Sequence, residues 1–267
     1  MTFHRHSSAF TLVELLVVVA IIGLLVASAT MGVRMAMENA RRAQCASNLR
    51  QLFIANTAYA SETGHYVPAA STSWSGRDLE RWHGYRESLR KPFVGELGPL
   101  ADYLDAKGIR MCPSCRFHND HLAPGDNFEL GCGGYGYNLV GVGSRLYLDG
   151  MTGPAFVEGM PFDGIADPAN TAMFADAAYL RPGGKKGRDS LIEYSFIEPY
   201  HWVFAPGTES SAVSEPTVHF RHRNHANVVW CDGHVGAVKM ENLPAKRYVR
   251  ARLGWIGPDD NSLMDPY

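Results

Sequence analysis

Two cysteines at C-x-x-C spacing are the strongest chemical signal outside the N-terminal region. The pair is followed by two histidines and a third cysteine: Cys112, Cys115, His118, His121 and Cys132. Thiolates and imidazoles are the ligands that Zn²⁺ prefers, and a structural site holds four of them in a tetrahedron. A zinc ribbon needs a second C-x-x-C pair about 15–20 residues further along, but Tyr135 stands where its second cysteine would be. A zinc site here would therefore need His118 or His121 as its fourth ligand.

A disulfide is the favoured alternative if this part of the chain lies outside the cytoplasm. The sequence contains five cysteines, and disulfides persist in oxidising compartments. We expect Cys112 or Cys115 to pair with Cys132. Because an odd number leaves at least one thiol unpaired, we expect Cys45 and Cys231 to stay reduced. A thioredoxin-like role is poorly supported, because no βαβ pattern surrounds the C-x-x-C pair.

A second group of potential ligands lies near the C-terminus. His222 is followed after nine residues by Asp232 and Gly233, and His234 comes next. Imidazole and carboxylate groups bind zinc and other divalent metals, and Asp176 is a further candidate for the same site. A structural role is the favoured interpretation, because Asp-Gly is typical of a hairpin turn and His222 can hydrogen-bond to the hairpin backbone.

Common catalytic motifs are missing from the sequence. There is no H-E-x-x-H metalloprotease motif and no G-x-S-x-G nucleophile elbow. The glycine-rich run 131–138 lacks the G-x-G-x-x-G spacing and a P-loop lysine, so it predicts tight turns that enter a strand. A net charge of -2 gives no general attraction for nucleic acid. We expect a protein that is not an enzyme, requires no cofactor and has no nucleic-acid partner.

One acidic residue, Glu14, lies near the start of a long apolar run. No charged residue occurs in residues 15–33, and a helix of about 20 residues crosses the core of a bilayer. An ionisable group at such a place is costly, which marks Glu14 as a candidate functional residue.

The residues around Glu14 carry a resemblance to a known family. Ala9 followed by Phe10-Thr-Leu-Val-Glu14 resembles the cleavage and methylation site of type IV prepilins and type II secretion pseudopilins. In that family a prepilin peptidase cuts before the phenylalanine and N-methylates it. Ala9 departs from the glycine that usually precedes the cut. The resemblance implies processing between Ala9 and Phe10, and assembly through the Phe10 amine of one subunit and Glu14 of its neighbour.

Two other interpretations of the apolar run stay open. The A-x-A motif at residues 27–29 fits the cleavage site of a secretory signal peptide. A plain membrane anchor would not be cut. The mature chain begins at Phe10 in the prepilin interpretation, at Thr30 after signal-peptide cleavage and at Met1 without cleavage.

A second resemblance concerns the C-terminal region. His222, Asp232 and Gly233 resemble the H-x9-DG signature of a prepilin-associated domain of unknown function, DUF1559, and Cys112-Pro and residues 171–176 fit its pattern. The family implies an exported pilin-like subunit, and no reaction is established for it. Analogy with major pseudopilins implies calcium as an alternative to zinc in a C-terminal loop.

One long helix is expected to run from residue 10 to residue 63, with Gly64 as its C-cap. In its second half, residues at spacings of three and four form one face, whereas polar residues such as Asn48 fall largely on other faces. The residues of this face are Cys45, Leu49, Leu52, Phe53, Asn56, Tyr59, Ala60 and Thr63. Asp232-Gly233 further predicts a type I′ hairpin that joins strands at 227–231 and 234–238.

These features predict an α+β, pilin-like fold, in which the long helix packs on an antiparallel β-sheet with loop-rich insertions. The expected parts are a leader (1–9), a transmembrane helix (10–33), its amphipathic continuation (34–64) and an exported β-rich domain (65–267). The resemblance implies a subunit of a type IV pilus or a type II secretion pseudopilus. The alternative is a membrane-tethered exported protein that binds a metal or another ligand and uses a prepilin-type sorting signal.

The expected partners are the prepilin peptidase, other pilin or pseudopilin subunits and the inner membrane. The chain would cross that membrane once, with its C-terminal domain in the periplasm or on the cell surface. Arg34, Arg41 and Arg42 follow the apolar run and oppose the positive-inside rule. The orientation therefore rests on the leader motif.

Overall fold

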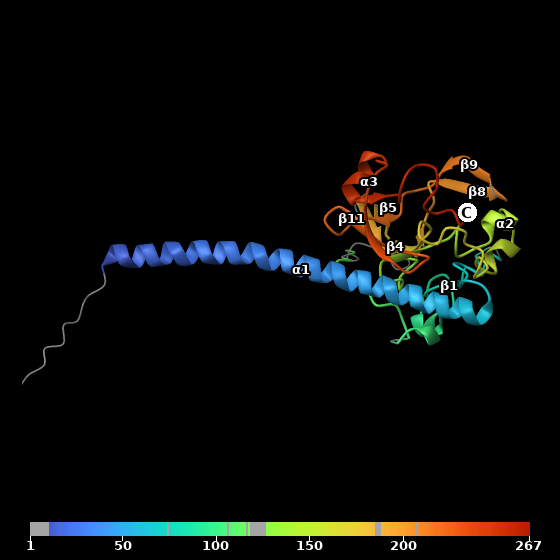
Figure 1. The fold of residues 1–267 in the computed structure, drawn as a ribbon, viewed down its shortest axis with the longest axis horizontal. Helices are drawn as coiled ribbons and strands as arrows, with labels where there is room; N and C mark the ends of the chain where they lie inside the picture. The colour runs from blue at the N-terminus through green and yellow to red at the C-terminus, as the bar shows by residue number, and fades with distance from the viewer. Residues whose placement is uncertain are drawn as a thin grey trace, which may run out of the picture. The chain divides into compact units, whose positions relative to one another are not determined.

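The computed structural model describes residues 11–73, 75–105, 107–115, 117, 127–184, 188–206 and 208–267. The chain divides into two compact units, with the boundary between Ala40 and Arg41. Helix α1 (Leu12–Thr63) contributes residues to both units, and the strands follow it in the second unit (Figure 1). The site residues predicted from the sequence that lie outside the described residues are Ala9, Phe10, His118 and His121.

A capping box begins α1. The backbone N–H and the hydroxyl of Thr11 donate to Oε2 of Glu14 at 2.9 and 2.8 Å, and the N–H of Glu14 donates to the Thr11 hydroxyl at 3.2 Å. This reciprocal pattern satisfies N–H groups near the helix start, where the first turn leaves donors without helical partners. Glu14 therefore has a local structural role in addition to any role in assembly.

The part of α1 in the first unit has no charged side chain from residue 15 to residue 33. Its large side chains are exposed, with Leu12 at 80% and Leu24 at 73%. Among the described residues, α1 is the one helix that is long and apolar enough to cross a membrane, judged by length and composition. A signal sequence satisfies the same criteria.

The part of α1 in the second unit ends where the sequence predicts. Gly64 follows the last helical residue with φ +85°, and its N–H donates to the carbonyl of Ala60 at 2.8 Å. Glycine adopts this C-cap conformation without strain. The buried face consists of Cys45, Asn48, Leu49, Leu52, Ala55, Asn56 and Ala60. The predicted face is largely confirmed, but Thr63 is exposed, and Asn48 is buried because its amide donates to the Tyr135 hydroxyl at 3.0 Å.

The central sheet lies in the second unit. Its strand order is β12 (Val235–Lys239), β11 (His225–Trp230), β4 (Ala172–Asp176), β3 (Tyr135–Asn138) and β7 (Phe196–Ile197). The β3–β7 pair is parallel and the other pairs are antiparallel. The α+β class is confirmed, and the sheet is antiparallel as predicted except at its β7 edge, where the pairing is parallel.

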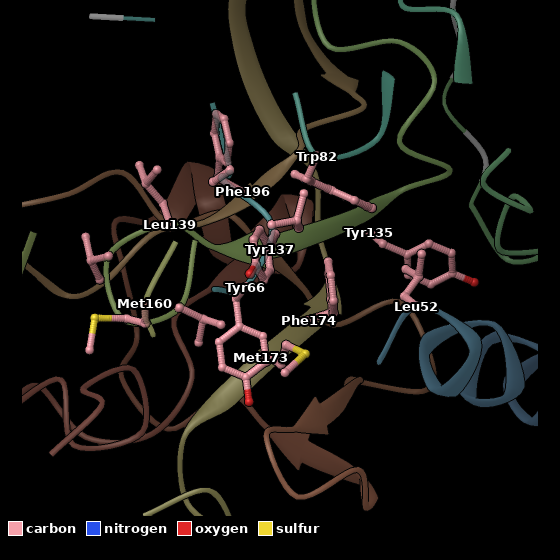
Figure 2. Packing of buried hydrophobic residues seen from close by; sticks show 14 of the residues in the cluster. Leu52, Tyr66, Trp82, Tyr135, Tyr137, Leu139, Met160, Met173, Phe174 and Phe196 are labelled. Atoms are coloured by element: carbon pink, nitrogen blue, oxygen red, sulfur yellow. The ribbon is translucent and has the colours of Figure 1, made fainter. Parts of the chain in front are cut away.

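Buried side chains cover both faces of this sheet, because successive residues of a strand point to opposite sides. Val229 of β11 belongs to the cluster that includes Leu49 and Leu52 of α1, whereas its neighbour Val228 packs in a second cluster with Ile256. Figure 2 shows part of the first cluster gathered about β3 and β4. The amphipathic half of α1 is thus packed on one face of the sheet, as predicted.

The β11–β12 hairpin confirms the predicted pairing but not the predicted turn. Val229 lies opposite Val235, and residues 231–234 connect the end of β11 to the start of β12. Gly233 has φ +88°, but Asp232 is not among the residues with positive φ. A type I′ turn requires positive φ at both central residues, so this prediction is wrong.

A turn with type I′ character occurs instead at the other end of β11. Arg223 and Asn224 have φ values of 53° and 64°. His222 and His225 exchange backbone hydrogen bonds of 3.0 and 3.1 Å across this two-residue loop. Two-residue loops with both φ values positive are the usual tight hairpin connection. The turn holds His222 beside the start of β11.

The other described elements are short. Their strands pair outside the central sheet, and the rest are short helical turns. The strand pairs are β1 (Glu80–Arg81) with β2 (Gly84–Tyr85), β5 (Tyr179–Gly184) with β6 (Arg188–Ile192), β8 (His201–Ala205) with β9 (Thr208–Val213), and β10 (Val218–His219) with β13 (Leu253–Gly254). The helical elements are η1 (Gly95–Leu97), η2 (Ala101–Tyr103), α2 (Leu146–Asp149), η4 (Pro154–Phe156) and α3 (Lys246–Ala251). These elements supply the loop-rich insertions that the composition predicts.

Candidate functional site

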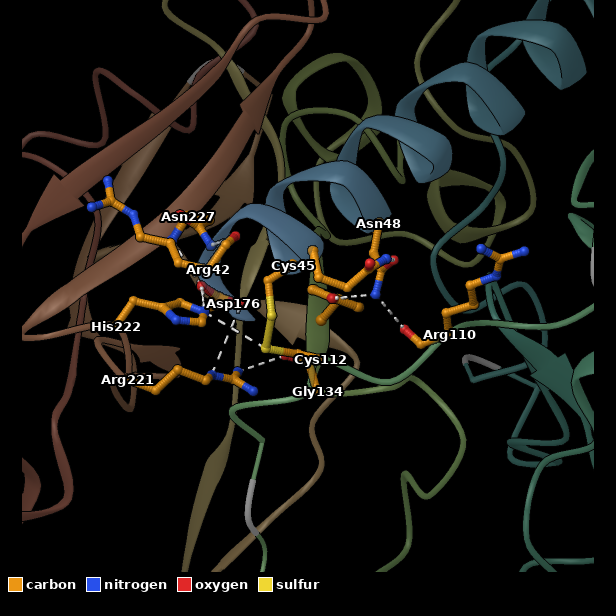
Figure 3. Close-up of a disulfide and its surroundings, with 12 residues drawn as sticks. Arg42, Cys45, Asn48, Arg110, Cys112, Gly134, Asp176, Arg221, His222 and Asn227 are labelled. Carbon is orange, nitrogen blue, oxygen red and sulfur yellow. Dashed lines mark hydrogen bonds and ion pairs between the residues drawn. A yellow bond between two sulfur atoms is a disulfide. The ribbon is translucent and has the colours of Figure 1, made fainter. Parts of the chain in front are cut away.

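A disulfide joins α1 to the loop that precedes β3. Its partners are Cys45 and Cys112, whose Cα atoms are 5.0 Å apart and which are separated by 67 positions in the sequence (Figure 3). Cys45 belongs to the buried face of α1, so the bond fastens this helix to the body of the second unit. Such a bond stabilises chiefly by restricting the unfolded chain, and more so for a longer loop.

The predicted cysteine pairing is wrong. Cys115 and Cys132 are free and buried, and Cys45, which was expected to stay reduced, is oxidised. The physical reason is the direction of each thiol: the Cys132 Sγ donates to a carboxylate oxygen of Glu193 at 3.5 Å, whereas the thiol of Cys45 faces Cys112 from the helix. The expectation that Cys231 stays reduced is confirmed.

His222 and Asp176 lie directly beside the disulfide (Figure 3). The Nε2 atom of His222 is 3.6 Å from Sγ of Cys112 and 3.3 Å from Oδ2 of Asp176. Together with the two cysteines of the disulfide, these residues form a cluster of four side chains. All four are completely buried, and their potential ligand atoms lie within 4.8 Å of one another. We call these four residues, Cys45, Cys112, Asp176 and His222, the buried centre.

The central sheet positions the two polar residues of the buried centre. Asp176 is the last residue of β4, and its Oδ2 accepts a hydrogen bond from the backbone N–H of Asn227 in the neighbouring β11 at 2.8 Å. His222 is held at the start of β11 by the turn at residues 223–224. The two strands therefore bring the carboxylate and the imidazole to the same end of the sheet, where α1 presents Cys45.

Arg221 provides a positive charge next to the buried centre. Its guanidinium donates to the carbonyls of Gly134 and Ala177 at 2.6 and 2.7 Å, and its Nε lies 3.9 Å from Oδ1 of Asp176. Burial lowers the pKa of Arg221, but the neighbouring Cys115 and Asp176 outweigh it and raise the pKa above its ordinary value. Arg221 therefore remains a cation and balances the charge of Asp176.

The H-x9-DG pattern has a geometric explanation in this fold. Its histidine lies at one end of β11, close to Cys45, and its Asp-Gly pair lies in the loop at the other end. Gly233 contacts Phe53, which follows Cys45 by eight positions on α1. The carbonyl of Gly233 accepts a hydrogen bond from Arg50 at 3.3 Å. The spacing of the pattern thus matches a strand whose two ends both contact α1.

Asp232 and His234 do not join the buried centre. Asp232 Oδ1 accepts hydrogen bonds from the backbone N–H of His234 at 3.0 Å and from its ring Nδ1 at 2.7 Å. Both side chains are substantially exposed, and the His234 ring stacks on Trp230. Asp232 lies in the hairpin loop, as predicted. Of the residues in the metal alternative, His222 and Asp176 lie together, whereas Asp232 and His234 lie at the other end of β11.

Among the described residues, Cys115 and Cys132 belong to no group of potential metal ligands, and His118 and His121, the predicted fourth ligands, lie outside the described residues. Cys112 is engaged in the disulfide, and burial raises the pKa of the Cys115 thiol to about 12, so that it remains protonated at neutral pH. Burial also raises the pKa of Cys132.

Sequence reasoning missed Cys45, although its place on the apolar face of the helix was the signal that it faces the body of the second unit.

Comparisons with known families identify two segments of the chain. Residues 4–30 match the prokaryotic N-terminal methylation motif, and residues 34–108 match a family of proteins of unknown function, DUF1559. The chain carries a prepilin-type methylation motif and a DUF1559 region. No curated protein and no solved structure matches it.

The methylation motif implies that this prepilin-type protein is processed by a prepilin peptidase and associates with a membrane. The DUF1559 match covers Cys45 and the buried half of α1 but ends before Cys112. The other three members of the buried centre therefore lie outside the matched segment, and the structure alone brings them together with Cys45.

A second group of buried charged residues surrounds Glu129, whose carboxylate is enclosed by hydrogen-bond donors. Glu129 accepts hydrogen bonds from the Arg81 guanidinium at 2.9–3.2 Å and from the Ser195 hydroxyl at 2.6 Å. Burial raises the pKa of Glu129, but His83 and Arg81 lower it to about 2. A carboxylate that is fully ionised and enclosed by fixed donors has a structural role in holding loops together.

Proposed function

We propose that this protein is a structural subunit of a filament of the type IV pilus or type II secretion pseudopilus class. In this proposal the chain is cut before Phe10 and polymerises through α1. The observation that carries the proposal is the exposed apolar surface of residues 12–33, on which Glu14 is the one charged side chain. A surface of this kind requires lipid or other helices as neighbours.

Glu14 has two tasks in this proposal. Within its own chain it caps α1 by accepting two hydrogen bonds from Thr11, and both of these bonds use Oε2. In the filament, its carboxylate neutralises the amine of Phe10 on an adjacent subunit. Pairing makes a buried charge tolerable in an apolar bundle.

The proposal assigns the second unit to the periplasm or the cell surface. The Cys45–Cys112 disulfide supports this location, because structural disulfides persist in oxidising compartments. We also propose that this unit is not an enzyme, since its described buried carboxylates all accept hydrogen bonds from neighbours within the fold. These residues are Glu129, Asp176, Glu193 and Glu198. It would act as the displayed body of the filament subunit.

Shearing of surface filaments tests this proposal. Cells that produce the full-length protein are sheared, and the released filaments are sedimented and probed for the protein. We expect the processed chain in the filament fraction when the prepilin peptidase is active, and uncut chain in the membrane fraction when it is inactivated. A chain that stays in the membrane fraction in both cases would support the tethered alternative instead.

A membrane-tethered metal-binding protein is the second candidate function. The buried centre favours it, because two cysteines, a histidine and a carboxylate are brought together from four separate segments. This candidate predicts no polymer, so the shearing experiment separates it from the first.

A further inference from the structure

The buried centre contains two groups that a disulfide does not require. A disulfide is neutral and makes weak hydrogen bonds, yet the carboxylate of Asp176 and the imidazole of His222 are turned toward it (Figure 3). Oδ1 of Asp176 accepts no hydrogen bond from the described residues and has the Arg221 Nε at 3.9 Å as its charged neighbour. Oδ1 therefore keeps the guanidinium as its charged partner, whereas Oδ2 is the oxygen that faces the His222 ring. A ligand that all four side chains share would explain this arrangement.

The donor set and its distances match a tetrahedral zinc site. Zn–N and Zn–O bonds of about 2.0–2.1 Å and Zn–S bonds of about 2.3 Å place the nitrogen about 3.3 Å from the oxygen and about 3.6 Å from a sulfur. His222 Nε2 lies 3.3 Å from Oδ2 of Asp176 and 3.6 Å from Sγ of Cys112. These two edges of the tetrahedron are therefore present already. The remaining requirement is a separation of the two sulfurs to about 3.8 Å, which needs reduction of the disulfide.

The surroundings also suit a metal. Two thiolates and one carboxylate carry three negative charges, so Zn²⁺ leaves a single negative charge that Arg221 balances from 3.9 Å. The N–H of Asn227 holds Oδ2 of Asp176 in place at 2.8 Å. Neighbours that orient the ligands in this way are typical of zinc sites.

We propose that Cys45, Cys112, Asp176 and His222 bind Zn²⁺ when the disulfide is reduced, so that zinc and disulfide are alternative states of one buried centre. This inference goes beyond the filament proposal and does not depend on it. Each reduced cysteine loses a proton and binds zinc as a thiolate. A disulfide-donating oxidant converts this state: the two thiolates form the Cys45–Cys112 bond, two electrons reduce the disulfide of the oxidant to two thiolates, and Zn²⁺ is released.

The site is closed, because all four ligands are completely buried. A closed site with four protein ligands is structural rather than catalytic. Zinc would fasten α1, the loop before β3, the end of β4 and the start of β11 in the reduced chain. These segments are the same ones that the disulfide and its neighbours join in the oxidised chain.

Metal binding to the full-length protein in detergent micelles tests the proposal. The protein is reduced with a phosphine, desalted without oxygen and loaded with Zn²⁺ or Co²⁺, and a matched sample is kept oxidised. We expect one metal ion per reduced chain and none per oxidised chain. The cobalt form should show tetrahedral absorption bands and a charge-transfer band with the intensity of two thiolate ligands.

Variants assign the ligands. Cys45→Ser and His222→Gln should weaken zinc affinity by more than the roughly 10–100-fold that loss of a supporting neighbour causes. Cys132→Ser and Cys231→Ser are matched controls, because both remove a buried free cysteine outside the buried centre, and they should bind as tightly as the parent chain.

Two results would overturn the proposal. One is a reduced parent chain that binds no metal or gives a cobalt spectrum without two thiolates, which decides the matter even if a ligand variant fails to fold. The other is loss of binding in Cys132→Ser with retention in Cys45→Ser. That result would assign the metal to the cysteines around the C-x-x-C pair instead.

Discussion

Gly233 packs so closely against Phe53 that no larger residue fits without movement. A Cβ atom at Gly233 would lie 2.5 Å from Cε1 of the Phe53 ring, and the residue has φ +88°. The contact joins the β11–β12 loop to α1 within the second unit. Glycine is therefore required at this position of the H-x9-DG pattern for two reasons: its backbone has positive φ, and the Phe53 ring leaves no room for a side chain.

Gly233→Ala should therefore destabilise the second unit. Strain at positive φ and the clash with Phe53 each contribute about 1–3 kcal/mol. Urea unfolding of the full-length protein in micelles measures the change. Gly236→Ala is the matched control on the same hairpin, because its nearest neighbour would be the Trp230 Nε1 at 3.4 Å and its φ is not positive. Equal losses of unfolding free energy in the two variants would contradict the close packing of Gly233 against Phe53.

Reduction of the Cys45–Cys112 disulfide should lower the free energy of unfolding in the absence of metal. A closed loop of 67 positions predicts a loss of about 4 kcal/mol from the entropy of the unfolded chain. Urea unfolding with and without a phosphine reductant, in the presence of a chelator, measures it. Mass spectrometry of unreduced proteolytic peptides should identify the cross-link between Cys45 and Cys112. A Cys112–Cys132 or Cys115–Cys132 peptide as the main product would refute the pairing.

Glu198 should make stability depend on pH. Burial raises the pKa of Glu198 to about 7, although the Tyr194 hydroxyl, which donates to it at 2.7 Å, lowers it. The folded protein then binds more protons than the unfolded chain between pH about 4.5 and pH about 7, so stability falls as pH rises through this window. The total loss is up to about 3 kcal/mol.

Glu198→Gln provides the control for this prediction, because the amide keeps the shape but does not titrate. The pH dependence of the unfolding free energy should be flatter in this variant between pH about 4.5 and pH about 7. Parallel curves for the two proteins would show that Glu198 titrates alike in the folded and unfolded states.

Two substitutions at Glu14 separate helix capping from charge pairing. Glu14→Gln preserves the capping box with Thr11, since glutamine accepts the same hydrogen bonds, and removes the charge. Glu14→Ala removes both. We expect both variants to be missing from sheared filaments, because assembly requires the charge, and we expect only Glu14→Ala to lose helicity at the start of α1. Normal incorporation of Glu14→Gln would contradict charge pairing between subunits.

Local patterns predict much of this fold. The helix and its end at Gly64 follow from periodicity and a glycine cap, and the strands β11 and β12 follow from apolar runs on either side of an Asp-Gly pair. The turn types do not follow, because Arg223 and Asn224 take positive φ without a glycine to signal it. Asn224 is a residue type that tolerates positive φ, but Arg223 is not a usual signal for this turn.

The candidate site is predicted in part. His222, Asp176 and Cys112 are recognisable from their residue types, but their common partner, Cys45, is separated from Cys112 by 67 positions. The short C-x-x-C spacing suggested a local pairing, whereas packing of the helix on the sheet decides which thiols meet. Contacts between distant segments depend on tertiary packing that spacing alone does not encode.

The mature N-terminus of the protein in sheared filaments is the most direct measure of the proposed function. Mass spectrometry of the N-terminal peptide should show a chain that begins at N-methylated Phe10 and includes Glu14. A chain that begins at Thr30 would lack the acid needed for assembly, and a chain that keeps Met1 would lack the free amine of Phe10. Either result would contradict the proposal that this protein polymerises as a processed filament subunit.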